Sequence, residues 1–224
     1  MDKQTPILKL QVAQRISVGP ASKVWTPSDF LDLGQRDAVD KTIQRMVASH
    51  ALRRIDRGLY DQPRTNQLTG HAAVVDYISV IDAVGRRYQV RILPDGMTAA
   101  NDLGLTNAVP GQVIIHTDGR LRPIVLDNLI IQFKLTAPSK LFWAGRPAVS
   151  IVQALYWLRD ELKSNDATDP SVVSAKLRRM LADPKAVLVR GDLVSGLNTL
   201  PYWMQNWLRE LLGNIDLSTK GVRQ

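Results

Sequence analysis

KVWTPSDFLDLGQRDAVDKTIQRMVASHALRRIDRGLY, residues Lys23–Tyr60, has the order of signals expected for a helix, a turn, a second helix and a tight hairpin. Thr26 stands just before a proline, which suits an N-cap followed by proline in the first helical turn, and Ser28 could cap instead. The short helix Pro27–Leu33 is then expected to end at Gly34, a residue suited to a C-terminal cap.

A second helix is expected from about Arg36 to Ser49. At 100° per residue, one of its faces collects the apolar side chains Val39, Ile43, Met46 and Val47. The opposite face collects Asp37, Lys41, Gln44, Arg45 and Ala48. A helix that lies in the major groove of DNA needs an outer face of this kind, with long hydrogen-bond donors and few bulky apolar groups.

A basic hairpin is expected after this helix, because Leu52–Ile55 and Leu59–Tyr60 are separated by the three residues Asp56–Gly58. Glycine in the third place fits a three-residue hairpin that ends in a left-handed glycine. The hairpin contains the arginines Arg53, Arg54 and Arg57. Guanidinium groups on a protruding ribbon are well placed to contact phosphates or to enter a minor groove.

Helix, helix and hairpin together favour a winged helix-turn-helix that contacts DNA. The residues expected to form the DNA-contacting surface are Thr26, Ser28, Gln35, Arg36, Lys41, Gln44, Arg45, Arg53, Arg54 and Arg57. Two alternatives stay open, because charged outer faces are usually only solvated and winged helices also bind proteins. The module could therefore be an adaptor for a protein or for RNA.

The composition narrows the class of protein. The 224 residues include no cysteine, which excludes disulfide scaffolds, thiolate zinc sites and cysteine nucleophiles. The net charge of +8 favours a polyanionic partner, and residues 1–65 alone carry 11 Lys/Arg and 7 Asp. No apolar run is long enough to cross a bilayer and no signal peptide is recognisable, so we expect a cytoplasmic protein without a membrane partner.

The sequence contains no common catalytic or phosphate-binding motif. Its histidines, His50, His71 and His116, are isolated from one another and from carboxylates at metal-ligand spacing. Glutamate occurs only at Glu161 and Glu210. We therefore expect no catalytic residues, no metal, no cofactor and no enzymatic activity, although scattered aspartates could still converge on a metal in three dimensions.

Two domains are expected. A helix over Pro6–Ile16, with Ile7, Leu8, Leu10, Val12 and Ile16 available for packing, would complete an N-terminal domain of residues 1–65. The polar, proline-marked segment Pro63–Thr69 is the expected boundary. Residues 66–224 are expected to form a larger α+β domain with a small, mainly antiparallel sheet and a helical C-terminal tail.

Hydrophobic periodicity predicts the elements of the second domain. Helices are expected over Gly70–Arg87, Gly96–Leu103, Pro147–Leu162, Pro170–Leu181, Pro184–Val194 and Pro201–Leu212. Strands are expected over Tyr88–Leu93, Gln112–Thr117, Leu121–Leu126 and Leu129–Leu135, with a hairpin turn at Asp118-Gly119 joining the second and third. In the last helix Trp203 and Trp207 are interpreted as an aromatic stripe that packs it onto the domain, with an exposed docking face as the alternative.

Two segments carry a resemblance to a known family: VWTPSDFLDLGQRDAVDKTIQRMVASHALRRIDRGLYDQP at Val24–Pro63 and ILPDGMTAANDLGLTNAVPGQVIIHTDG at Ile92–Gly119. The resemblance continues through the strands and the helix after Phe142 and covers most of Pro6–Leu162. On these motifs the chain resembles the AbiEi-type antitoxins of type IV bacterial toxin–antitoxin systems, which are transcriptional regulators.

This resemblance implies an N-terminal winged helix that binds double-stranded operator DNA, often at inverted repeats, and represses its own operon. It also implies a C-terminal domain that counters a nucleotidyltransferase toxin without forming a stable complex with it. By the same analogy Arg36, Lys41, Gln44 and Arg45, with the arginines of the hairpin, take the DNA-binding role.

Overall fold

The computed structural model describes residues 4–65, 70, 72–107, 111–160, 162 and 170–220. The chain separates into two compact units, Met1–Ile92 with Arg122–Ile131, and Leu93–Leu121 with Gln132–Gln224. The expected boundary at Pro63–Thr69 falls mostly on residues 66–69, which lie outside the described residues. The division into 1–65 and 66–224 therefore stays a prediction.

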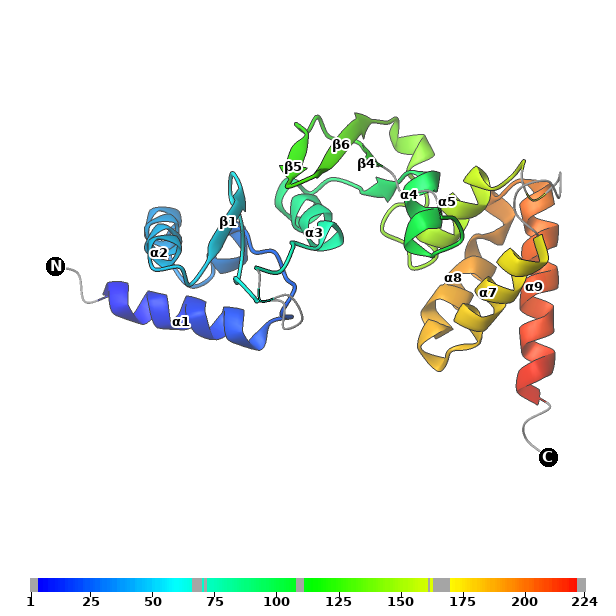
Figure 1. Ribbon diagram of the computed structural model, residues 1–224, viewed down its shortest axis with the longest axis horizontal. Helices are drawn as coiled ribbons and strands as arrows, with labels where there is room; N and C mark the ends of the chain where they lie inside the picture. Colours follow the sequence, from blue (N-terminus) through cyan, green and yellow to red (C-terminus); the bar gives the residue numbers. More distant parts are fainter. Residues whose placement is uncertain are drawn as a thin grey trace. The chain divides into compact units, whose positions relative to one another are not determined.

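The described parts of the chain combine helices with two small sheets, so the α+β class is confirmed (Figure 1). The strands are β1 (Arg53–Asp56), β2 (Leu59–Asp61), β3 (Leu93–Pro94), β4 (Gln112–Thr117), β5 (Ile124–Leu126) and β6 (Leu129–Leu135). Strands β1 and β2 form a two-stranded sheet, and the other four lie in the order β3-β4-β6-β5. The pairs β1–β2, β3–β4 and β5–β6 are antiparallel.

The first helix, α1 (Gln4–Val18), is longer than predicted and packs against α2 (Arg36–Ala48) (Figure 1). It buries Leu8, Val12 and Ile16, which recur every four residues and so share one face. Ile7 and Leu10 were expected to pack as well, but they are exposed because they fall on another face of the helix.

The helix expected over Pro27–Leu33 is shorter and tighter than predicted. It is a single 3₁₀ turn, η1 (Pro27–Phe30), followed by a bonded turn in which the amide of Leu33 donates to the carbonyl of Phe30. The carboxylate of Asp29 accepts from the backbone amide and the hydroxyl of Thr26, at 2.7 and 2.9 Å, and so closes the turn. Thr26 is thus the N-cap, as predicted.

The second helix, α2, agrees with its prediction to within one residue. Its buried side chains are Val39, Thr42, Ile43 and Met46, and Val47 packs partly against the same core. Thr42 was not expected there, but its hydroxyl donates to the carbonyl of Ala38 at 2.8 Å, so the polar group is satisfied inside the helix.

The predicted hairpin is present with a shorter loop. Strand β1 extends through Asp56, which pairs with Leu59, so that only Arg57 and Gly58 connect the strands. A bulge between Arg54 and Asp56 accommodates the extra strand residue. Gly58 has φ of +72°, which confirms the predicted left-handed glycine.

The helix expected over Gly70–Arg87 begins later, as α3 (Tyr77–Tyr88). The carboxylate of Asp76 accepts from the amides of Ile78 and Ser79, so this aspartate, whose own backbone is extended, is the N-cap. Gln89 adopts a left-handed conformation, with φ of 53°, and ends the helix. The strand expected over Tyr88–Leu93 is consequently wrong, and only its last residue enters β3.

In the region around β4 the predicted elements are present, but the strand expected over Leu121–Leu126 is only Ile124–Leu126, and the predicted pairing was wrong. Helix α4 (Gly96–Asp102) begins at the predicted cap Asp95, and β4 and β6 have the predicted bounds. However, β6 lies between β4 and β5, so the predicted hairpin through Asp118-Gly119 is wrong. Strand β5 pairs instead with β6 through a turn in which Asp127 has φ of 47°.

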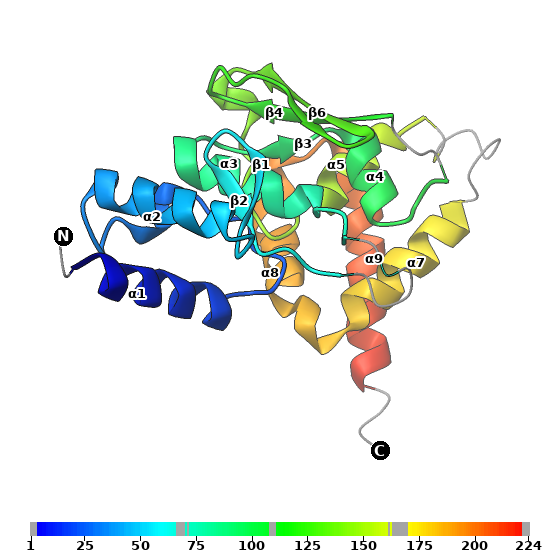
Figure 2. The ribbon, with the colours of Figure 1, turned by 60° about the vertical axis from the view of Figure 1, so that its left-hand side comes forward.

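The second unit is closed by helices. α5 (Val149–Trp157) packs against α4, and α7 (Pro170–Ala182) packs against α8 (Val187–Gly196) and α9 (Tyr202–Lys220), as Figure 2 shows. A 3₁₀ turn, η3 (Pro184–Ala186), replaces the predicted start of α8. Trp203 and Trp207 pack against the core of this unit, which confirms the interpretation of the aromatic stripe.

Candidate nucleic-acid interface

The outer face of α2 presents three long hydrogen-bond donors in its middle turns. Lys41, Gln44 and Arg45 are exposed and lie at positions i, i+3 and i+4, so they share one face. None of the three makes a side-chain hydrogen bond or ion pair with any residue that the structure describes. Their donors are therefore open to an external partner.

In the first turns of α2, the basic side chain on this outer face is already paired. Arg36 donates to Asp40 one turn later, at 2.8 Å, and Asp37 is exposed beside this pair. Acidic groups near the first turn complement the helix dipole, so they stabilise α2 rather than attract an anion. Gln35 is exposed at the N-cap position without bonding the helix through its side chain. The unpaired donors are thus concentrated toward the middle of α2.

The hairpin separates its arginines onto two faces, because successive side chains of a strand alternate. Arg54 and Arg57 are exposed, and over the described residues neither makes a side-chain hydrogen bond or ion pair. Arg53 faces the other way and binds both carboxylate oxygens of Asp61, at 3.0 and 2.6 Å, and the carbonyl of Ala73. The hydrogen bonds that Arg53 donates to Asp61 raise the pKa of Arg53. Arg53 was expected to contact DNA; because its donors are taken up by Asp61 and Ala73, we leave it out of the proposed interface and assign it to holding the hairpin together.

Replacing Arg53 with alanine is expected to lower the free energy of unfolding of the N-terminal unit by about 2–3 kcal/mol, because it leaves a carboxylate unpaired in a largely buried place. The side chain of Asp61 is only 10% exposed. Urea unfolding checks this, with Arg54→Ala as the matched control on the exposed face, where a change of at most about 0.5 kcal/mol is expected. Equal losses for the two variants would contradict the structural role of Arg53.

Two arginines from elsewhere in the N-terminal unit hold the tip of the hairpin. Arg87 in α3 donates to the carbonyl of Arg57 at 2.6 Å, and Arg122 reaches both oxygens of Asp56, at 2.8 and 2.7 Å. A Cβ added to Gly58 would lie 2.5 Å from the same guanidinium of Arg87. These contacts were not predicted, because no local pattern links residues 30 and 66 positions apart.

The turn that precedes α2 offers fewer residues to the candidate interface than the sequence predicted. The side chain of Thr26 is 1% exposed and bonded to Asp29, so it has no surface from which to contact a partner. Ser28, two residues later, is exposed. We therefore retain Ser28 and leave Thr26 out of the interface.

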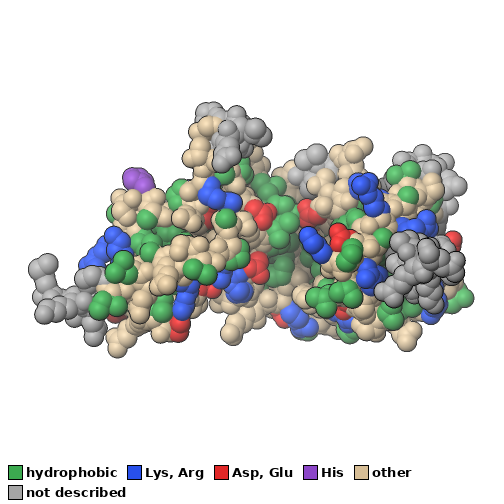
Figure 3. All heavy atoms as spheres, turned by 90° about the horizontal axis from the view of Figure 1, so that it is seen from below, with side chains coloured by type: hydrophobic (Ala, Val, Ile, Leu, Met, Phe, Trp, Pro, Cys, Tyr) green, Lys and Arg blue, Asp and Glu red, His purple; other side chains and the backbone are tan. Residues whose placement is uncertain are grey.

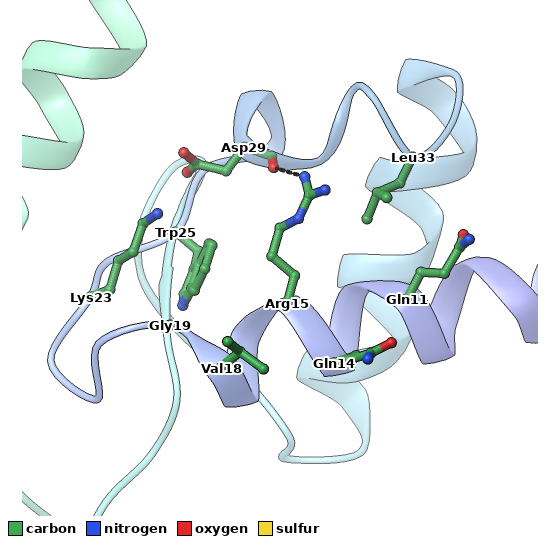
Figure 4. Close-up of a pocket in the computed structure, with 9 residues that line it drawn as sticks. All are labelled: Gln11, Gln14, Arg15, Val18, Gly19, Lys23, Trp25, Asp29 and Leu33. Atoms are coloured by element: carbon green, nitrogen blue, oxygen red, sulfur yellow. Dashed lines mark hydrogen bonds between the residues drawn. The ribbon is translucent and has the colours of Figure 1, made fainter.

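A hollow between α1 and η1 lies in the same unit (Figure 4). Arg15 crosses it toward the carbonyl of Asp29 and binds both oxygens of Asp32, at 2.5 and 2.6 Å. This hydrogen bonding lowers the pKa of Asp32. The ammonium of Lys23 lies 4.1 Å from the centre of the Trp25 ring. Because both cations already have partners, the hollow is a weaker site for an anion than α2.

The described residues offer no group of metal ligands, and the face drawn in Figure 3 shows no single basic patch. In the described part of the chain no three His, Cys, Asp or Glu side chains are grouped to hold a metal ion. His50 is exposed, His116 bonds Thr136 at 3.0 Å, and His71 lies outside the described residues. On the face drawn in Figure 3, basic side chains lie among acidic and apolar ones. No helix within the described ranges is long and apolar enough to span a membrane.

Comparisons with known proteins found a family and one solved structure of low similarity. The model of a family described as "Family of unknown function (DUF6088)" matches residues 11–187. No curated protein matches the chain. Among solved structures, the chain is similar to the RV2827C protein from Mycobacterium tuberculosis, with 18% identity over 89% of this chain and 67% of that one, and a TM-score of 0.39.

Proposed function

The chain belongs to DUF6088, a family of unknown function, and we propose that it is a DNA-binding autorepressor of the bacterial cytoplasm. In this proposal the N-terminal elements form a winged helix-turn-helix, in which η1 and α2 are the paired helices and the β1–β2 hairpin is the wing. Helix α2 enters the major groove, and the wing contacts the phosphate backbone beside it.

The observation that carries the proposal is the group of unpaired donors on α2. Lysine and arginine donate to the O6 and N7 acceptors of guanine, and glutamine pairs with the N6 and N7 edge of adenine. Lys41, Gln44 and Arg45 supply these chemistries from one exposed face. The alternative role, an adaptor for protein or RNA, does not require base-specific donors in this arrangement.

The wing supports the proposal through its charge and its rigidity. Arg54 and Arg57 provide unpaired guanidinium groups, which suit phosphate oxygens. Since Arg87 and Arg122 already hold the backbone and the acidic side chain of the tip, less conformational entropy is lost when a phosphate binds. Positioning contacts of this kind set the register of α2 without reading sequence.

Replacing Arg54 and Arg57 together with glutamine is expected to weaken binding to all DNA sequences alike. Each lost phosphate contact removes about 0.9 from the slope of log affinity against log salt, so the slope should become shallower by roughly 1.8. Mobility shifts with the DNA upstream of the chain's own gene, over a salt series, measure this. The matched control is Arg120→Gln with Arg159→Gln, two exposed arginines of the second unit.

The proposal is wrong if the unchanged protein shows no preference for its upstream DNA over a scrambled duplex. Unchanged repression by the Arg54 and Arg57 double variant, together with binding to a protein or RNA, would favour the adaptor instead.

We further propose that the protein is the antitoxin of a type IV system, with a nucleotidyltransferase toxin as its counterpart. The support is the resemblance that runs through Val24–Pro63 and Ile92–Gly119. Co-expression with a nucleotidyltransferase encoded beside the gene should restore growth, without the two proteins co-purifying. Continued growth arrest during co-expression would contradict the antitoxin role and leave the DNA-binding proposal intact.

A further inference from the structure

A pocket of about 490 Å³ lies within the second unit and takes no part in the proposed DNA interface. Its deepest side chains are Leu93 and Trp143, which are 5% and 6% exposed. Phe142 and Tyr156 are exposed at its rim. The polar side chains that line it are His116, Thr136, Ser139, Lys140, Gln153 and Thr199. An apolar floor with a few convergent polar groups is the usual composition of a small-molecule site.

Neighbouring residues hold the two aromatic rings of the pocket, Phe142 and Trp143, in place. The guanidinium carbon of Arg146 lies 4.7 Å from the ring centre of Phe142 and 4.4 Å from that of Trp143. Asp192 fixes this arginine through an ion pair of 2.7 Å, and a Cβ added to Gly196 would lie only 2.3 Å from the Trp143 ring. The two rings therefore have little freedom, and a flat ligand can stack without first ordering them.

The polar wall pairs His116 with a threonine: Nδ1 of the ring lies 3.0 Å from the hydroxyl oxygen of Thr136. When that hydroxyl donates to the carbonyl of Lys134, 3.2 Å away, its oxygen accepts from Nδ1. Burial lowers the pKa of His116, so the neutral ring is favoured. With the proton on Nδ1, the Nε2 atom is an acceptor for an amino or hydroxyl group of a ligand.

We propose that this pocket binds a nucleoside monophosphate. The planar base stacks on the exposed aromatic rim, and His116 and Gln153 bond its polar edge or its sugar. Lys140 and Ser139, on the short turn η2 (Pro138–Lys140), bind the phosphate. Lys140 is the one Lys or Arg among the described residues that line the pocket, so it matches a monophosphate better than a triphosphate.

Titration of the ¹⁵N-labelled full chain with AMP, GMP, CMP and UMP tests the proposal by NMR. At least one of them is expected to bind with a Kd below 1 mM, about −4.1 kcal/mol, and to shift the side-chain signals of His116 and Trp143. Weaker binding is expected for ribose 5-phosphate, which lacks the base, and for the matching nucleoside, which lacks the phosphate. The triphosphate is expected to bind no more tightly than the monophosphate.

Substitutions of lysines inside and outside the pocket test where the monophosphate binds. Replacing Lys140 with alanine should weaken the monophosphate by about tenfold, as expected for the loss of one charge-assisted hydrogen bond, and leave the nucleoside unchanged. Lys185→Ala, at an exposed lysine of the same unit outside the pocket, is the matched control and should change nothing. The proposal is overturned if no monophosphate binds below 1 mM, if the shifts map to α2, or if Lys140→Ala and Lys185→Ala have the same effect.

Discussion

Replacing Lys41, Gln44 and Arg45 together with alanine is expected to lower the affinity for the operator by at least about 100-fold, because each good base contact contributes roughly 1–3 kcal/mol of discrimination. The three side chains are exposed and unpaired within the described structure, and alanine is a strong helix former, so α2 should keep its fold. Binding to unrelated DNA should fall much less. Mobility shifts with operator and scrambled duplexes measure the two affinities separately.

The control replaces Lys9, Gln11 and Gln14, three exposed polar residues of α1 that include one positive charge. It should bind the operator as the unchanged protein does. Arg45→Ala alone should relax the preference at one base position rather than weaken all sequences alike. If the α2 and α1 triple variants bind the operator equally well, α2 is not the recognition helix.

Replacing Phe30 with alanine is expected to cost about 3–5 kcal/mol of unfolding free energy, confined to the N-terminal unit. Its ring is fully buried and stacks on Trp25 at 5.3 Å. Amide hydrogen exchange should accelerate by about 10²–10⁴-fold in α1 and α2, while α7 and α9 should be unchanged. Operator binding should fall with the population of the folded unit.

Leu31→Ala is the control for Phe30, because Leu31 is 45% exposed on the neighbouring position. Such a surface change typically costs within about 0.5 kcal/mol, so exchange should stay close to that of the unchanged protein. Similar exchange rates for the two variants would show that Phe30 is not part of the core that supports α2.

Local rules predicted the elements whose signals do not depend on distant partners. The periodicity of α2, the cap at Asp95 and the bounds of β4 and β6 follow from neighbouring residues, and all agree with the structure. The partner of β5 could not be predicted in this way, because alternation indicates which face of a strand is buried and not which strand lies beside it. At α3 a continuous apolar pattern suggested an early start, but the capping carboxylate of Asp76 set the true one.

The residues of the candidate interface also divide into those that local spacing predicts and those that depend on distant partners. The outer face of α2 was predictable from spacing alone. Arg53 and Arg54 are adjacent and chemically identical, and only the cross-strand register, which places Arg53 opposite Asp61, separates the structural residue from the exposed one. The roles of Arg87 and Arg122 depend on tertiary contacts that sequence spacing does not encode.

The N-terminal unit is built from two separate segments of the chain, and this affects the order in which its contacts can form during synthesis. Residues 122–131 belong with the first 92, so roughly 40 residues must be made before the last pieces of the unit are available. At about 5–20 residues per second, a ribosome needs several seconds for this interval. During that time α2 and the hairpin can form on the nascent chain, but the ion pair between Asp56 and Arg122 cannot form yet. The protein thus emerges with its proposed DNA-binding elements first, and the ion pair that holds the tip of the hairpin forms later.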